Sequence, residues 1–404
     1  MGEHDKIKGR LARDRGDRGP GATIAHLLAV RLWTLCTKKG GKCTSRPAIS
    51  ATLTVGATPI CVLPPMTHVI AMFPPRNFPV TWLGLAACLA LLPSVPAVAD
   101  TPAGALAPQP LYRDPVFDGA ADPIVVWNPH VARWWMFYTN RRANQPGLSG
   151  VSWVHGCRIG IAESTDGAAW SYRGTADIEL PPEIGGAEPT HWAPEIVTDA
   201  AGLHHLFLTV VPGIFEDWKH PRTLVHLTST DLRTWRNPQP LHLASDRVID
   251  ACVRPLPAGG WRLWYNNERD GKSTYYADSP DLATWTDRGK CTDVAGRPGE
   301  GPFVFTWRGH HWMIIDLWKG LAVFRSDDLE HWTPQPEDLL AQPGRGADDG
   351  VIGGHAGVVV SGERAYLIYF THPGRTGPIR PEDKDSLALR RSSLQVVELR
   401  EQDG

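Results

Sequence analysis

Four stretches of the chain share one pattern: Ser164-Thr-Asp-Gly-Ala-Ala-Trp170, Ser229-Thr-Asp-Leu-Arg-Thr-Trp235, Ser279-Pro-Asp-Leu-Ala-Thr-Trp285 and Ser326-Asp-Asp-Leu-Glu-His-Trp332. Each reads Ser-x-Asp-x-x-x-Trp, and successive tryptophans are 65, 50 and 47 residues apart. Spacings of this size are typical of units of three or four strands, such as the blades of a β-propeller. We expect the aspartates to accept backbone hydrogen bonds in tight turns and the tryptophans to pack between blades. We therefore interpret Asp166, Asp231, Asp281 and Asp328 as structural residues.

Strand-like runs precede each repeat and are separated by turn residues. In the first unit, Ile124–Trp127 and Trp134–Tyr138 flank Asn128-Pro129, as an antiparallel hairpin requires. A fifth unit lacks the repeated pattern but has the same hairpin, with strands at Gly357–Val360 and Ala365–Tyr369. Helical periodicity is scarce. The sequence thus predicts an all-β fold, a five-bladed β-propeller with antiparallel blades around a central channel. A β-sandwich is the alternative, but it would not explain the repeated Asp and Trp.

The N-terminal quarter of the chain reads differently. Residues 72–99 resemble a secretory signal: an apolar run, Val80–Leu92, is followed by the small residues Ala97-Val-Ala99. The run is too short and too interrupted by proline for a stable membrane span. Cleavage there would give a secreted or periplasmic protein. A second interpretation is a lipoprotein, with a lipid on Cys88.

Residues 1–71 precede that segment and are predicted to lie outside the fold. Up to position 50 they carry 11 Lys or Arg against four Asp or Glu, so we interpret them as a basic disordered or mis-annotated extension. Residues 100–404 would then form the propeller. The whole chain has a formal net charge of −2, which implies no nucleic-acid partner. Cys157, Cys252 and Cys291 allow at most one disulfide, and the oligomeric state is not set by the sequence.

The first strands of the five units line the channel of a propeller, and ionisable residues stand at their beginnings. In order, these are Asp122, Glu195, Asp250, Glu300 and His355. Carboxyl groups are costly to bury unless they are paired or functional. Carboxyl groups held close together also raise one another's pKa, which separates an acid from a base. Such a set suits glycoside cleavage.

These motifs resemble those of glycoside hydrolase family 43, and related five-bladed families 32, 68, 117 and 130 share the architecture. The resemblance covers about residues 112–399 and lies in Ala121-Asp-Pro123, Trp192-Ala-Pro-Glu195, Asp250, Gly299-Glu-Gly-Pro302 and Gly354-His355. It implies that Asp122 is the general base, that Glu300 is the general acid, and that Asp250 tunes and positions the acid. It further implies inversion of configuration without a catalytic cofactor, and a channel Ca²⁺ near His355. In the retaining families, the residue like Asp122 is instead a nucleophile.

Sugar recognition needs flat apolar faces and bidentate donors. The candidates for substrate binding are Trp192, Glu195, Trp264, Asp316 and Arg375, with Trp318 beside Asp316. Three loops, 140–157, 183–191 and 212–222, are expected to build the substrate subsites. His191 and the pair His310-His311 also fit the branch of related enzymes that acts on agar oligosaccharides.

The sequence therefore predicts a hydrolase of arabinose- or xylose-containing oligosaccharides or polysaccharides. Two alternatives stay open. One is a related propeller glycosidase or phosphorylase acting on fructosides, anhydrogalactose or mannosides. The other is a carbohydrate-binding propeller without catalytic activity.

Overall fold

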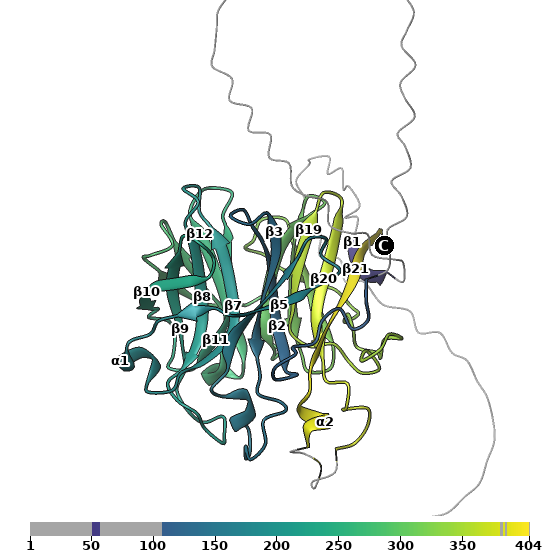
Figure 1. Ribbon diagram of the computed structural model, residues 1–404. Helices are drawn as coiled ribbons and strands as arrows, with labels where there is room; N and C mark the ends of the chain where they lie inside the picture. The colour runs from purple at the N-terminus through teal and green to yellow at the C-terminus, as the bar shows by residue number, and fades with distance from the viewer. Residues whose placement is uncertain (1–50, 57–106, 380–382, 384–385, 404) are drawn as a thin grey trace, which may run out of the picture. The chain divides into compact units, whose positions relative to one another are not determined.

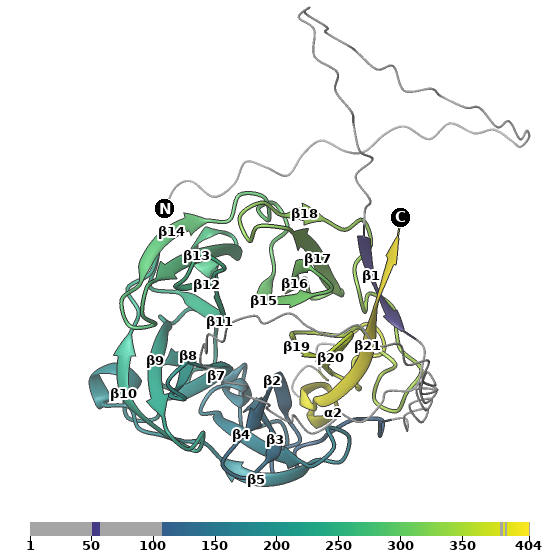
Figure 2. The same ribbon diagram turned by 90° about the horizontal axis from the view of Figure 1, so that it is seen from above.

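The computed structural model describes residues 51–56, 107–379, 383 and 386–403, and the described residues form a five-bladed β-propeller. In each blade the strands run antiparallel from the centre outwards, and Figure 2 shows β2, β7, β11, β15 and β19 innermost. The predicted all-β class and the five blades are confirmed. Figure 1 gives the side view of the same blades.

The blades follow one another along the chain. Blade 1 contains β2 (Ala120–Asn128), β3 (Arg133–Asn140), β4 (Arg158–Ser164) and β5 (Ser171–Thr175). Blade 2 contains β7 (Thr190–Thr198), β8 (His204–Val211), β9 (Thr223–Ser229) and β10 (Thr234–Pro240), with the short β6 (Asp177–Ile178) parallel to β10. Blade 3 contains β11 (Val248–Pro255), β12 (Trp261–Asn267), β13 (Ser273–Ser279) and β14 (Thr286–Lys290). Blade 4 contains β15 (Glu300–Trp307), β16 (His310–Asp316), β17 (Leu321–Ser326) and β18 (Thr333–Pro334).

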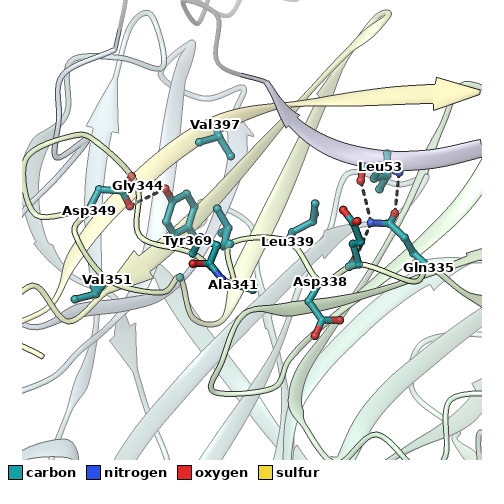
Figure 3. Close-up of a pocket in the computed structure, with 14 residues that line it drawn as sticks. Leu53, Gln335, Asp338, Leu339, Ala341, Gly344, Asp349, Val351, Tyr369 and Val397 are labelled. Atoms are coloured by element: carbon teal, nitrogen blue, oxygen red, sulfur yellow. Dashed lines mark hydrogen bonds between the residues drawn. The ribbon is translucent and has the colours of Figure 1, made fainter. Parts of the chain in front are cut away.

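The fifth blade takes its outer strand from the front of the chain. Its inner strands are β19 (Ala356–Ser361), β20 (Arg364–Thr371) and β21 (Ser393–Asp403), and β1 (Ala51–Gly56) pairs antiparallel with β21. Leu53 is fully buried, and its backbone exchanges two hydrogen bonds with the Gln335 side chain, of 2.8 and 3.0 Å (Figure 3). The expectation that residues 1–71 lie outside the fold therefore does not hold for residues 51–56. The remainder of that stretch and the segment 72–99 lie outside the described residues.

The repeated Ser-x-Asp-x-x-x-Trp pattern forms the turn between the third and fourth strands of blades 1 to 4. In blade 2 the Ser229 hydroxyl accepts the backbone N–H groups of Asp231 and Leu232, while Asp231 Oδ1 accepts those of Arg233 and Thr234. The residue after the aspartate has a left-handed backbone each time, with φ of 63–74° at Gly167, Leu232, Leu282 and Leu329. The structure thus agrees with a structural role for the repeated aspartates.

The repeated tryptophans pack against the preceding blade. Trp235 of blade 2 contacts Phe137 of blade 1 at 6.5 Å between ring centroids. Trp285 of blade 3 meets Phe207 of blade 2 at 5.5 Å, and Trp332 of blade 4 meets Trp264 of blade 3 at 6.2 Å. Buried aromatic rings contribute strongly to packing, so these contacts join neighbouring blades.

A β-bulge interrupts the inner strand of blades 1 to 4 at one equivalent place. The register shifts between Ala121 and Ile124, Trp192 and Glu195, Ile249 and Cys252, and Glu300 and Phe303. The first bulged residue has a positive φ in every case: 51° at Asp122, 42° at Ala193, 59° at Asp250 and 60° at Gly301. Bulges re-aim side chains next to functional sites, and in blades 1 and 3 the bulged residue is an aspartate, Asp122 or Asp250.

The remaining features are minor. The helices α1 (Pro182–Gly185) and α2 (Leu387–Arg390) span four residues each, so neither α-helix in the described part of the chain is long enough to cross a membrane. Cys157, Cys252 and Cys291 are buried and free, so the disulfide that the sequence allowed is not formed among them.

Candidate functional site

A pocket of about 490 Å³ opens at the end of the propeller where the inner strands begin. Because the blades are antiparallel, the second strand of each blade ends at that same end. The pocket is therefore lined by the first residues of inner strands and by the connections that follow second strands. Its volume is in the usual range for ligand sites. We call it the central pocket; its lining residues are Asp122, Arg141, Trp153, Val154, Trp192, Trp218, Arg222, Arg247, Ile249, Asp250, Glu268, Lys272, Glu300, Trp318, His355, His372 and Arg375.

Asp122 is the bulged residue of blade 1 and is held by a cation. The Arg141 guanidinium, directly after β3, donates from Nη2 to both carboxyl oxygens of Asp122, at 3.0 and 3.2 Å. His355 Nδ1 lies 3.6 Å from Asp122 Oδ1. The side chain is 7% exposed, so its paired charge faces the pocket from a nearly closed position. These charge-assisted contacts orient the carboxyl group of Asp122 in the pocket.

Asp250 is the equivalent bulged residue of blade 3. Its Oδ2 accepts the backbone N–H of Gly301 at 3.0 Å, which joins it to the bulge that carries Glu300. Burial, with smaller contributions from Glu300 and Asp122, raises the pKa of Asp250 to about 7, although His355 and Lys272 oppose the shift. Asp250 thus gains or loses a proton near neutral pH and is electrostatically coupled to both other carboxyl groups.

Glu300 projects from the start of blade 4 and contacts Lys272. The Lys272 ammonium donates to Glu300 Oε2 at 2.8 Å and lies 2.7 Å from Glu268 Oε1. Burial lowers the pKa of Lys272, but the two carboxylates outweigh it and raise the value above normal. Glu268 also forms ion pairs with Arg222 and, at 3.8 Å, with Arg247. One wall of the pocket is thus an ion-pair network that ends at Glu300.

His355 lies among the carboxyl groups. Asp316 Oδ2 accepts its backbone N–H at 2.7 Å, and a Cβ on Gly301 would come within 2.5 Å of its ring. Burial lowers the pKa of His355, but Asp250, Asp122, Asp316 and Glu300 together raise it above the usual value. These carboxyl groups thus favour the protonated form of the ring, which lies beside Asp122.

The calcium ion expected near His355 needs a separate test. Among the residues that the structure describes, no three His, Cys, Asp or Glu side chains are placed to hold a metal ion together. His355 itself is engaged with Asp122. Calcium prefers six to eight oxygen ligands. A channel calcium ion near His355 therefore stays a prediction, and the described residues offer it no cluster of three or more such side chains.

Aromatic rings form the rim of the pocket. Trp218 is 49% exposed and Trp318 46%, which is unusual for tryptophan side chains in this chain. Trp192 donates from Nε1 to the Val154 carbonyl at 2.6 Å and lies 6.0 Å from the Trp218 ring. Beneath these two rings, His155 is fully buried, and burial lowers its pKa to about 4. Flat, partly exposed rings of this kind suit the apolar faces of sugars.

Seven of the ten site residues named from the sequence line the central pocket: Asp122, Asp250, Glu300, Trp192, Trp318, His355 and Arg375. Glu195 does not line it. It is 2% exposed and forms an ion pair with Arg254 while accepting the Val253 N–H at 3.1 Å, which ties blade 2 to blade 3. When the bulges of the two strands are aligned, Trp192 is the counterpart of Glu300, and Glu195 lies three residues further along the strand.

Two other predicted substrate-binding residues also lie behind the pocket wall. Trp264 is 1% exposed and belongs to the core around blades 3 and 4. Asp316 accepts the backbone N–H groups of Trp318 and His355, so it positions pocket residues without lining the pocket. Among the histidines, neither His191 nor the pair His310 and His311 lines the pocket.

Several lining residues were not named from the sequence. Arg141, Glu268 and His372 each come directly after a second strand, and Lys272 ends the connection that Glu268 begins. These connections differ in length and share no motif, so no repeated pattern marks them. The loops 140–157 and 212–222, in contrast, do bring Trp153, Trp218 and Arg222 to the pocket, as expected.

Comparison with known proteins places the fold. No protein-family model matches the chain, and no curated protein matches it in sequence. Solved structures do match. A family-43 β-1,3-galactosidase solved with galactodeoxynojirimycin has a TM-score of 0.52 and 16% identity, over 72% of this chain and 94% of that chain. A thermostable family-43 glycoside hydrolase has a TM-score of 0.50 and 16% identity, over 71% and 92%. A β-xylosidase has a TM-score of 0.50 and 12% identity, over 70% and 93%. The chain therefore has the five-bladed propeller fold of family-43 glycoside hydrolases.

Proposed function

We propose that this protein is an inverting glycoside hydrolase whose base is Asp122 and whose acid is Glu300. One observation carries the proposal: Asp122, Asp250 and Glu300 come from three different blades and line one pocket. A fold alone does not imply function, so the argument rests on the site. The likeness to family-43 structures supports the same conclusion at the level of the fold.

The roles follow from the contacts of each carboxyl group. Asp122, ionised between Arg141 and His355, takes a proton from a water that attacks the anomeric carbon. Glu300, entering the reaction protonated, gives its proton to the glycosidic oxygen as the carbon–oxygen bond breaks. Inversion requires the two carboxyl groups to be roughly 6.5–9.5 Å apart, to leave room for that water.

Asp250 is a positioning residue in this scheme. It accepts the Gly301 N–H next to Glu300 and titrates near pH 7, so its charge changes in the range where the enzyme would work. Lys272 holds Glu300 from the other side. The two contacts fix the direction of the acid.

The proposed substrates are glycans containing arabinose or xylose, as the sequence motifs imply. The β-xylosidase among the similar structures supports this choice, and the β-1,3-galactosidase makes galactosides the next class to test. We further propose export directed by residues 72–99. Since β1 precedes that segment, cleavage after Ala99 would cut the covalent link between β1 and the propeller.

The test is hydrolysis of aryl arabinofuranosides, xylosides and galactosides, and of the matching oligosaccharides, by the full-length protein. Asp122→Asn and Glu300→Gln are expected to lower kcat by at least about a thousandfold, since each removes a group that moves a proton in the transition state. Asp166→Asn, in a repeat turn outside the pocket, is the matched control and should retain activity.

The stereochemistry of the product separates the mechanisms. An α-linked substrate giving a β-product by proton NMR supports inversion, while retained configuration would make Asp122 a nucleophile. Turnover that survives both Asp122→Asn and Glu300→Gln would refute the catalytic assignment. Binding of glycans without hydrolysis of any of them would favour a carbohydrate-binding propeller.

A further inference from the structure

The charges around the central pocket do not balance during the proposed reaction. Five cationic side chains line the pocket, Arg141, Arg222, Arg247, Lys272 and Arg375, against four carboxyl groups, Asp122, Asp250, Glu268 and Glu300. The acid must enter the reaction protonated, which leaves three carboxylates at most. The lining is then positively charged overall, before any charge on His355 is counted.

Four of the five cations have a carboxylate partner. Arg141 pairs with Asp122, and Arg222, Arg247 and Lys272 share Glu268. A cation beside a catalytic carboxylate needs no ligand to explain it. The charges of these four residues are balanced within the site itself.

Arg375 differs from the other four. Among the described residues, its only hydrogen bond from the side chain goes from Nε to the Leu389 carbonyl, at 2.9 Å, and it makes no ion pair. The charged group that acts on it is another cation: burial, together with Arg141, lowers the pKa of Arg375 to about 10. The neighbouring His372 cannot supply an anion, and burial with the two arginines holds its pKa well below normal, which favours the neutral ring. Arg375 thus lines the pocket as a solvent-exposed cation, with no anion paired to it among the described residues.

Arg222 adds an independent observation on another side of the pocket. Its side chain is 1% exposed, and its Nε and Nη2 are bound by Glu268 and by the Trp218 carbonyl, at 3.0 Å for the latter. Its Nη1 is buried and has no hydrogen-bond partner among the described residues. A buried donor left unpaired in a lining residue calls for a ligand or water that accepts from it.

We propose that the glycan bound in the central pocket is anionic, and that it carries a uronosyl carboxylate or a sulfate ester that pairs with Arg375. This proposal rests on the proposed glycosidase function and narrows its substrate class. The planar fork of a guanidinium matches two oxygens of a carboxylate or sulfate, so Arg375 would recognise the anion bidentately. A neutral sugar would leave this cation without a counter-charge and next to Arg141.

The experiment is calorimetric titration of the full-length protein with methyl glucuronide, galacturonic acid and galactose 6-sulfate, each against its neutral parent sugar. The Glu300→Gln variant is titrated in parallel, so that binding is measured without turnover. We expect each binding anion to have a Kd at least about tenfold below that of its neutral parent at low salt, as for a charge-assisted pair. The preference should shrink as ionic strength rises.

Matched arginine variants assign the preference. Arg375→Gln should reduce the preference for the anionic sugar by about tenfold and leave the affinity for the neutral sugar within about twofold of the wild type. Arg375→Lys should keep part of the preference. Arg133→Gln, in the β2–β3 hairpin outside the pocket, should keep all of it. Equal melting temperatures of the variants would exclude misfolding.

The outcomes separate this proposal from the glycosidase proposal. Preference for the acid sugars names a uronate as the anion, and preference for the sulfated sugar names a sulfate ester. A preference for anions without hydrolysis of any glycoside would overturn only the catalytic proposal. Equal affinity for neutral and anionic sugars, or an equal loss of both in Arg375→Gln, would overturn the anionic-substrate proposal even if neutral glycosides were hydrolysed.

Discussion

Trp318 has a left-handed backbone, with φ of 59°, and a side chain that is 46% exposed at the central pocket. A left-handed backbone is strained for a tryptophan, and an exposed indole ring is unfavourable in water. Such backbone strain persists where the surrounding structure holds the residue in place. Asp316 does so by accepting the Trp318 N–H at 2.7 Å, and Lys272 Nζ lies 5.3 Å from the ring centroid. The exposed ring is therefore available to stack on a sugar.

Replacing Trp318 should weaken substrate binding more than it slows the reaction. We expect Trp318→Ala to raise KM by about 3- to 10-fold, the value of one aromatic contact, with a smaller change in kcat. Trp318→Phe retains a ring, so its KM should lie between that of the wild type and that of Trp318→Ala. Steady-state kinetics on the best substrate of the panel gives both constants. A lower kcat at unchanged KM would contradict a role in binding.

Gly301 shows how a single missing side chain fits His355 into the site. Its φ is 60°, and a Cβ there would meet the His355 ring at 2.5 Å. Gly362 has nearly the same φ, 57°, with nothing within 4 Å of the added atom. Gly301→Ala should therefore lower both the melting temperature and kcat, whereas Gly362→Ala should cost only the backbone penalty of about 1 kcal/mol. Equal effects of the two substitutions on activity would argue against the fit between Gly301 and His355.

At the scale of elements, the repeated motif made the blades predictable because it recurs at one turn of each blade. The ionisable residues at the inner strands were predictable for the same reason, and Asp122, Asp250, Glu300 and His355 do line one pocket. The misplaced Glu195 marks the limit of this reasoning. Glu195 lies three residues after Trp192, the counterpart of Glu300, and no sequence signal marks where the bulge falls in that strand.

The strand β1 could not be predicted from the sequence, and the reason is different. It lies more than 300 residues from its partner β21 along the chain, and it precedes a segment that reads as a signal. Its pairing covers an edge that would otherwise present unpaired backbone groups. Leu53 also lines, with Tyr369 and Val397, a groove between β1 and the loop 335–344 (Figure 3).

Replacing Leu53 measures how much β1 contributes to the stability of the fold. Its side chain is fully buried, so Leu53→Ala in the full-length protein should lower the free energy of unfolding by about 2–4 kcal/mol. Leu387→Ala, in α2 and 50% exposed, is the matched control and should change it little. Urea unfolding followed by tryptophan fluorescence measures both. An unchanged midpoint for Leu53→Ala would mean that β1 does not pair with β21 in solution.

At the scale of the whole molecule, two sets of buried ionisable groups have opposite effects on folding stability as pH falls. Burial lowers the pKa of His155 and His226 to about 4 and of His191 to about 3. Below about pH 6.5 these histidines bind protons in the unfolded chain but not in the folded protein. Stability is therefore lost as pH falls towards 4. Burial raises the pKa of Asp250 and Asp316 to about 7, so these carboxyls bind protons in the folded state first, and stability is gained as pH falls from 7 to 4.

Removing the two carboxyl groups should therefore expose the effect of the histidines. Each shifted group contributes at most about 1.4 kcal/mol per pH unit. We expect the double variant Asp250→Asn/Asp316→Asn to lose stability more steeply than the wild type between pH 6.5 and 4.5. Urea midpoints at pH 8, 6.5, 5.5 and 4.5 give both slopes, with the exposed Asp327→Asn as the control. Parallel curves for the wild type and the double variant would show that these carboxyls titrate alike in the folded and unfolded states. In that case Asp250 would not be the group that changes charge near neutral pH in the central pocket.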